Sequence, residues 1–116
     1  MTKLYGIKNC QSSNNARKWL DVADVAYAFV DLREDGVDDA QLQQWLGQHG
    51  ADKIVNKRSL TWRELDTDTR AACDDDPAAV LKAHPTLIKR PILENGSASI
   101  VGFSIVDYEA AHVRAK

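Results

Sequence analysis

The 116 residues make one domain of ordinary size, long enough to bury a core without disulfide or metal staples. The 44% of apolar and 28% of charged residues are usual for a soluble globular protein, and the net charge of −2 argues against nucleic acid as a direct partner. No stretch approaches the roughly 20 apolar residues of a membrane span, and the N-terminus lacks the layout of a signal peptide. We therefore expect a cytoplasmic protein without membrane contact.

The first third of the chain predicts a strand, a helix and a second strand. Lys3–Ile7 is a short β-compatible run, and Ser12 or Ser13 can cap the helix that follows. Four apolar residues recur at helical spacing: Ala16, Trp19, Leu20 and Ala23. Residues 26–32 form the second strand candidate. A βαβ unit of this length requires parallel strands and a right-handed crossover.

The middle of the chain predicts helices. Asp38, with Gln41 three residues later, forms a capping-box pattern, and Gly50 ends the first of them. A second helix is expected over residues 67–73. A third begins where Asp76 caps it and ends at Pro85.

The end of the chain predicts two strands and a helix. Residues 86–93 and 98–103 are the strand candidates, and Asn95-Gly96 between them is a strong hairpin signal. Ser104 can cap a last helix. This helix carries Ile105, Tyr108 and Val113.

This order of elements is typical of a thioredoxin-like fold. We expect an α/β protein with a βαβ half and a ββα half, a single domain over residues 1–116, and a helical insertion at about 38–85. Such a fold normally places its reactive cysteine between the first strand and the first helix. Cys10 is at that place.

The two cysteines have opposite surroundings. Residues 1–20 contain no acidic side chain and four basic ones, which are Lys3, Lys8, Arg17 and Lys18. This charge and the start of a helix favour the thiolate of Cys10, although a buried, unreactive thiol remains an alternative. Cys73 precedes three aspartates, so its thiolate is disfavoured and we expect a structural residue, with a slow resolving thiol as the alternative. Neither cysteine has zinc-site spacing, and both should be free thiols in a reducing compartment.

Ser13 stands where a dithiol protein would have its second cysteine. A C-x-x-S sequence cannot close a local disulfide, so the thiolate needs an external thiol to complete its cycle. The hydroxyl can still donate a hydrogen bond that helps to hold Cys10 ionised.

Two basic residues precede Pro91. A proline that opens a strand in this half of the fold is often cis, and a cis peptide would bring the backbone beside the cysteine loop, where an extended thiol peptide could bind. Arg90 offers a fork-shaped donor for a carboxylate or oxyanion. The alternative is that Lys89 and Arg90 only form a solvated strand end. Arg58 is a weaker candidate that needs its loop to fold back toward Cys10.

Four segments, "LYGIKNC", "NKRSLTWREL", "HPTLIKRPIL" and "IVGFS", resemble the arsenate-reductase-like family of ArsC, Spx and YffB proteins in order and spacing. The resemblance covers nearly the whole chain and is nearest to YffB-type thiol reductases linked to glutathione. It implies an enzyme, a glutathione-linked thiol oxidoreductase, with Cys10 as the nucleophile and Arg90 as the anion-binding arginine. It implies no metal and no tightly bound cofactor.

We expect Cys10 to attack a small oxidised substrate and form a covalent intermediate, which glutathione resolves while lying along Pro91. The predicted site consists of Cys10 and Arg90 as catalytic residues and of Lys8, Asn9, Ser13, Arg58, Lys89 and Pro91 as residues that bind substrate or glutathione.

Two alternatives follow from the same resemblance. Arsenate reductases of the family surround the cysteine with three arginines, but the first falls at Asn56 and the third at Gly102 or Phe103. Spx-type regulators bind RNA polymerase and usually carry C-x-x-C as a redox switch. Ser13 removes that switch, although a role in binding a protein partner survives.

Overall fold

The structure, a computed structural model, describes residues 2–96 and 98–112. The chain divides into two compact units. Unit 1 combines the described residues up to 31 with those from 90 on, and unit 2 consists of residues 32–89.

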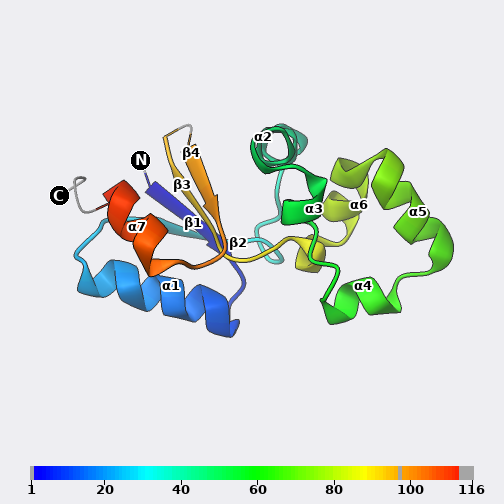
Figure 1. Cartoon of the computed structure of the whole chain (residues 1–116). Coiled ribbons are helices and arrows are strands. Elements are labelled where there is room, and N and C mark those ends of the chain that lie inside the picture. The colour runs from blue at the N-terminus through cyan, green and yellow to red at the C-terminus, as the bar shows by residue number, and fades with distance from the viewer. Residues whose placement is uncertain (1, 97, 113–116) are drawn as a thin grey trace. The chain divides into compact units, whose positions relative to one another are not determined.

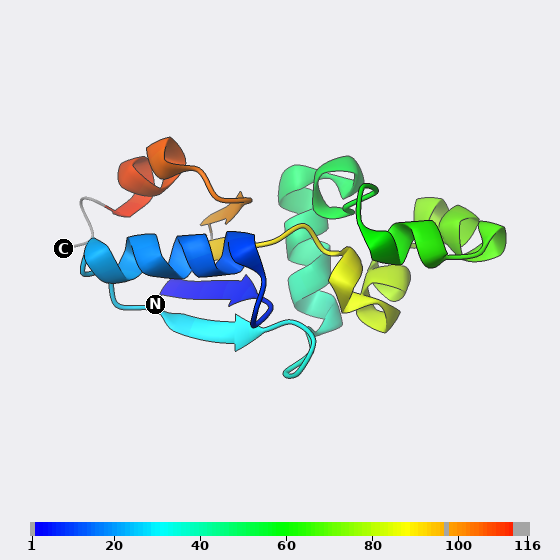
Figure 2. The ribbon, with the colours of Figure 1, turned by 90° about the horizontal axis from the view of Figure 1, so that it is seen from below.

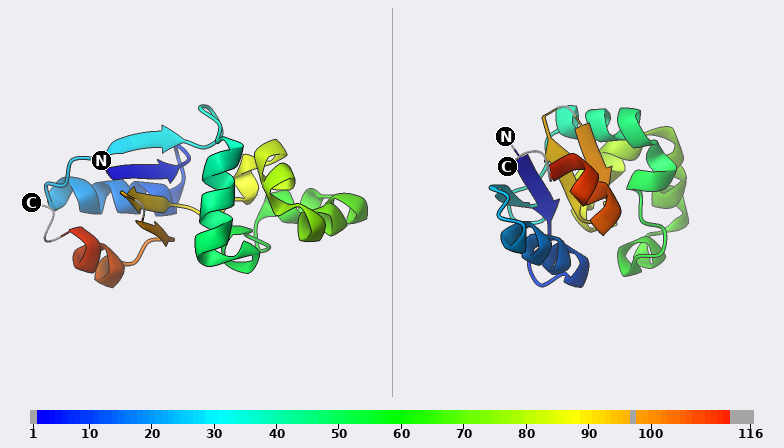
Figure 3. Two further views of the ribbon diagram at one scale, coloured as in Figure 1. Left: turned by 90° about the horizontal axis from the view of Figure 1, so that it is seen from above. Right: turned by 60° about the vertical axis from the view of Figure 1, so that its left-hand side comes forward.

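Unit 1 holds a four-stranded sheet in the order β2-β1-β3-β4. Its elements are β1 (Thr2–Gly6), α1 (Gln11–Val22), β2 (Ala28–Asp31), β3 (Ile92–Asn95), β4 (Ala98–Val101) and α7 (Ile105–His112). β1 and β2 are parallel and α1 runs back alongside them (Figure 2). β3 is antiparallel to both β1 and β4 (Figure 3). The strand–helix–strand prediction and the mixed α/β, thioredoxin-like fold are confirmed.

The core of unit 1 lies between the sheet and two helices on one of its faces. α1 and α7 both cover this face (Figure 1). Alternation along the strands turns Leu4 and Leu93 toward these helices, which contribute Ala16, Leu20 and Tyr108. All of these side chains are at most 1% exposed, so they fix the position of α1 against the sheet.

The hairpin predicted at Asn95-Gly96 is confirmed. Asn95 pairs with Ala98 across the turn, and Gly96 has a φ of 64°, which glycine adopts without strain. The last helix is confirmed too, since the Asp107 N–H lies 3.3 Å from the hydroxyl of Ser104. Val113, expected in this helix, lies outside the described residues.

Several predicted boundaries are wrong. The cap of α1 is Cys10 rather than Ser12 or Ser13. The strand expected over residues 86–93 begins only at Ile92, because Pro85 opens a 3₁₀ turn, η1 (Pro85–Leu87), and Pro91 has no N–H to donate to a ladder. The second strand ends at Val101, since Gly102 turns the chain with a φ of 83°.

Unit 2 is helical. It contains α2 (Asp39–His49), α3 (Ala51–Ile54), α4 (Leu60–Glu64), α5 (Thr67–Asp75), α6 (Pro77–Ala83) and η1 (Figure 1). The three helices predicted for this region are confirmed as α2, α5 and α6. The caps are confirmed as well, because Asp38 accepts the Gln41 N–H at 2.8 Å and Asp76 accepts the Ala79 N–H at 3.3 Å. No helix within the described ranges is long and apolar enough to cross a membrane.

Candidate active site

Cys10 lies where the chain passes from β1 into α1. Its backbone N–H donates to the Ile7 carbonyl at 3.2 Å, which closes a tight turn. Asn9 takes a φ of 65°, a conformation that asparagine tolerates better than most residues. Cys10 itself is the extended cap residue of the helix, and its side chain is half-buried. The predicted place of the cysteine in the loop is therefore confirmed.

Ser13 lies in the first turn of α1 and is fully buried. Its hydroxyl oxygen accepts the Ile7 N–H at 3.2 Å. The hydroxyl donates its single proton to the Cys10 sulfur. The backbone N–H of Ser13 donates to the same sulfur. The serine therefore fastens the loop and points two donors at the thiol.

Arg90 is the cation at this thiol. Burial of the sulfur opposes ionisation of Cys10, but the donors of Ser13 and the hydrogen bond and positive charge of Arg90 outweigh it. The pKa of Cys10 is therefore lowered from its ordinary value. The Arg17 guanidinium, which is nearer in sequence, lies 4.3 Å from the centre of the Phe29 ring.

Pro91 follows directly and opens β3. The Arg90–Pro91 peptide is cis, as predicted. Pro91 is buried, and its carbonyl accepts the Gly102 N–H at 2.8 Å, so the start of β3 is tied to the end of β4. Lys8 and Asn9, also predicted for this site, are exposed in the cysteine loop.

Cys73 is a different kind of thiol. It lies in α5 in unit 2, is 4% exposed and forms no disulfide. Burial, together with the charge of Asp74, raises its pKa. The predicted contrast between the two cysteines is confirmed in direction.

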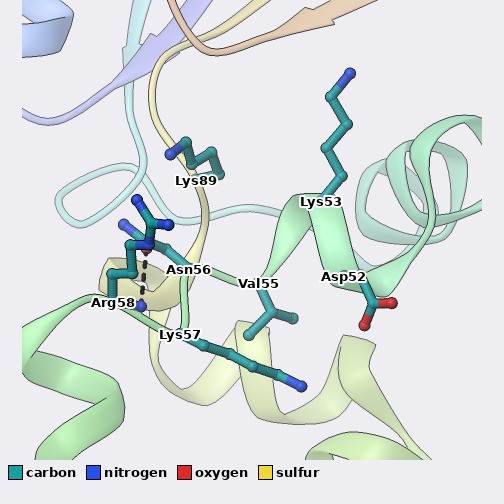
Figure 4. Close-up of a pocket in the computed structure, with 7 residues that line it drawn as sticks. All are labelled: Asp52, Lys53, Val55, Asn56, Lys57, Arg58 and Lys89. Atoms are coloured by element: carbon teal, nitrogen blue, oxygen red, sulfur yellow. Dashed lines mark hydrogen bonds between the residues drawn. The ribbon is translucent and has the colours of Figure 1, made fainter.

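Unit 2 brings two further predicted residues, Arg58 and Lys89, to one pocket of about 420 Å³. The Lys89 N–H donates to the Ile54 carbonyl and the Asn56 N–H to the Leu87 carbonyl, each at 2.7 Å, so both segments are held together. The Asn56 side chain then accepts the Arg58 N–H at 3.1 Å (Figure 4).

This pocket has an excess of positive charge. Its lining also contains Lys53 and Lys57, which the sequence analysis missed, against the single acidic residue Asp52. Lys57 lies 5.4 Å from the centre of the Trp62 ring, and in Figure 4 Lys53 and Lys57 extend away from Arg58. A charge count along residues 52–58 could have found this cluster.

A thioredoxin-like sheet with one serine-supported cysteine at the start of α1 defines a small protein of the thioredoxin-like class. Comparison with known proteins places it within this class. A model of the ArsC family matches residues 5–111, and the chain belongs to the ArsC family.

The relatives include an uncharacterised protein and a regulator of transcription. The chain is 43% identical to an uncharacterised protein of Haemophilus influenzae over 96% of this chain and 98% of the relative. It is 26% identical to the global transcriptional regulator Spx of Staphylococcus saprophyticus, over 90% of this chain and 81% of the regulator.

Two solved structures are similar to this chain over nearly its whole length. A YffB protein is 40% identical, with 96% of this chain and 98% of that chain covered and a TM-score of 0.90. A protein from Brucella melitensis described as related to arsenate reductase (ArsC) is 34% identical, with 94% and 92% covered and a TM-score of 0.73.

Proposed function

We propose that this protein is a thiol-dependent reductase in which Cys10 is the nucleophile and glutathione is the co-substrate. The observation that carries the proposal is the set of donors at the Cys10 sulfur, two from Ser13 and one from Arg90. They favour the thiolate, which is the form that attacks disulfides and other oxidised sulfur.

The reaction at Cys10 has two displacements. In the first, the Cys10 thiolate attacks one sulfur of a disulfide, forms a mixed disulfide and releases the other sulfur as a thiolate. In the second, a glutathione thiolate attacks the sulfur of the bound group and releases the Cys10 thiolate. One substrate sulfur is thus released as a thiolate, and the other leaves in a disulfide with glutathione. A second glutathione thiolate displaces that sulfur, so two glutathione thiols supply the two electrons that reduce the substrate and end as oxidised glutathione. No metal and no tightly bound cofactor is needed.

The need for an external thiol follows from the lack of a suitable second cysteine in the chain. Position 13 is serine, so the C-x-x-C pair is missing. Cys73 is buried and its pKa is raised, which makes it a poor resolving thiol. A reducing compartment such as the cytoplasm would supply glutathione and keep both thiols free.

We assign the binding of the glutathione carboxylates to basic residues. Lys8 and Arg90 are the candidates, and both belong to the unit that holds Cys10. Arg58 and Lys89, the other basic residues expected from the sequence, line the pocket of unit 2. Guanidinium and ammonium groups bind carboxylates with charge-assisted hydrogen bonds. Asn9 offers polar backbone groups to the peptide part of glutathione, which we expect to lie along Pro91.

The test is the reaction of the purified protein with oxidised glutathione, followed by mass spectrometry of the peptides. We expect a glutathione adduct on Cys10 that free glutathione removes, and catalysis of glutathione-dependent reduction of hydroxyethyl disulfide. Cys73→Ser should keep both activities, whereas Cys10→Ser should lose them. Arg90→Ala should slow adduct formation about tenfold, since it removes both a donor and a charge. An unchanged rate in Arg90→Ala would overturn the role of the arginine.

The Spx relative favours one second candidate, a regulator that acts by binding RNA polymerase. Such a protein should bind its partner unchanged when Cys10 is replaced by serine. A pull-down of purified RNA polymerase with the wild type and Cys10→Ser separates the two functions. Stable binding by both, with no glutathione adduct in the wild type, favours the regulator.

The Brucella relative keeps arsenate reduction as a further candidate. Arsenate carries several negative charges and needs several fixed cations. Asn56, Gly102 and Phe103 stand where two of the three arginines are expected, so we propose that arsenate is a poor substrate. Arsenate turnover faster than disulfide turnover in parallel assays would reverse this ranking.

A further inference from the structure

Two consecutive backbone N–H groups of the cysteine loop are held by buried side chains. Ser13 accepts the N–H of Ile7 at 3.2 Å, and the Asp31 carboxylate accepts the N–H of Lys8 at 2.9 Å. These two acceptors come from different elements, α1 and β2. The loop that ends at Cys10 is therefore fastened from both sides.

Asp31 is an unusual residue for its position. It is the last residue of β2, pairs with Gly6 of β1, and is only 2% exposed. A carboxylate is costly to bury unless hydrogen bonds to it offset the loss of water. Nearby negative charge also disfavours a thiolate, so a carboxylate bonded to the backbone of Lys8, two residues before Cys10, would not be expected on electrostatic grounds alone.

We propose that Asp31 is a positioning residue for Cys10. Its hydrogen bond fixes the backbone of Lys8 and thereby the turn between Ile7 and Cys10. This turn puts the Cys10 sulfur within reach of Ser13 and Arg90. Asp31 is not among the groups that act on the sulfur directly. It acts through the backbone of the loop. This inference rests on the proposed function, because the placement matters only if Cys10 reacts as a thiolate.

The charge and the positioning of Asp31 have opposite consequences, which makes the proposal testable. If only its charge mattered, removal of the carboxylate would lower the pKa of Cys10 and speed its alkylation. If it positions the loop, removal frees Lys8, moves the sulfur away from its donors and slows alkylation. A purely structural role would lower stability and leave the reactivity of Cys10 in the folded protein unchanged.

The experiment measures the alkylation rate of Cys10 against pH in the wild type, Asp31→Ala and Asp31→Asn, with Asp21→Asn as a control. Asp21 is an exposed carboxylate of α1 in the same unit. Asparagine keeps an oxygen acceptor for the Lys8 N–H, whereas alanine has none. We expect Asp31→Ala to slow alkylation at neutral pH about tenfold, which a rise of one pKa unit produces, and Asp31→Asn and Asp21→Asn to react as the wild type or slightly faster.

Equal or faster alkylation in folded Asp31→Ala overturns the inference while leaving the proposed function intact. A wild-type Cys10 with an ordinary pKa overturns the proposed function instead. If Asp31→Ala does not fold, amide hydrogen exchange of the Lys8 N–H in the wild type and in Asp31→Asn tests the proposal instead. Protection of the Lys8 N–H in both the wild type and Asp31→Asn supports the proposal, and rapid exchange in the wild type contradicts it.

Discussion

Gly6 and Ser13 lie so close together that a side chain at Gly6 would collide with the Ser13 hydroxyl. A Cβ at this position would also approach the Ser13 Cβ to 2.9 Å and the Phe29 ring to 3.3 Å. The glycine therefore lets α1 approach β1 closely enough for the serine to reach both the loop and the thiol.

Gly6→Ala should disturb stability and reactivity together. Overpacking at a buried contact costs about 1–3 kcal/mol, and we expect a loss of this size in the free energy of unfolding measured in urea. Because the serine must move, alkylation of Cys10 should slow as well. Gly47→Ala is the control, since Gly47 lies in α2 with open space around it and should become slightly more stable. Normal stability of Gly6→Ala would contradict the close packing.

Ser13→Ala should raise the pKa of Cys10. The variant removes the hydroxyl donor to the sulfur and leaves the buried Ile7 N–H without its acceptor, which costs about 1–3 kcal/mol of stability. We expect alkylation at neutral pH to slow by about three- to tenfold. Ser12→Ala, an exposed neighbour in the same helical turn, should behave as the wild type. Equal reactivity of the two variants would show that the hydroxyl does not assist the thiolate.

The two thiols should give opposite pH dependences of stability. The pKa of Cys10 in the native protein lies below 9.0, the ordinary value that we take for the unfolded chain. Between the native pKa and 9.0 the unfolded state binds more protons, so the free energy of unfolding rises with pH. The extra stability of the wild type over Cys10→Ser should therefore grow as the pH rises from the native pKa toward 9.0, and vanish as the pH falls through the native pKa.

The pKa of Cys73 is raised above 9.0, so the stabilisation from its neutral thiol is present below that value and is lost at higher pH. The advantage of the wild type over Cys73→Ser should shrink there. Urea unfolding at a series of pH values measures both differences, and parallel curves for the two variants would contradict the assignment.

Tyr108→Phe should stabilise the protein. Among the residues that the structure describes, the Tyr108 hydroxyl is buried without a hydrogen-bond partner, and burial raises its pKa. Its ring keeps edge contacts with Trp19 and Phe103 at centroid distances of 5.5 and 5.1 Å, which phenylalanine can retain. An unpaired buried hydroxyl costs about 1–3 kcal/mol, and we expect a gain up to this size in urea. A loss of stability would indicate a partner for the hydroxyl.

Much of the fold could be predicted because its signals are local. Asp38, Asp76 and the Asn95-Gly96 turn each act within a few residues, and all of them are confirmed. α3 and α4 were not predicted, since helices of 4 and 5 residues are too short to show a helical period.

The site was predicted less completely because its contacts join distant segments. Cys10 could be placed from the order of elements, but its lowered pKa comes from Ser13 and Arg90, and Arg90 lies far from it in sequence, just before β3. The hydrogen bond from Lys8 to Asp31 depends on strand register, for which no local pattern in the sequence is a signal.

The most direct test of the account is the alkylation rate of Cys10 and Cys73 as a function of pH, each quantified by peptide mass in the folded wild type. The account predicts that Cys10 titrates below its ordinary pKa and well below Cys73, and that it reacts faster at neutral pH. Two thiols that titrate together near the ordinary value would contradict the central claim that Cys10 is an activated nucleophile.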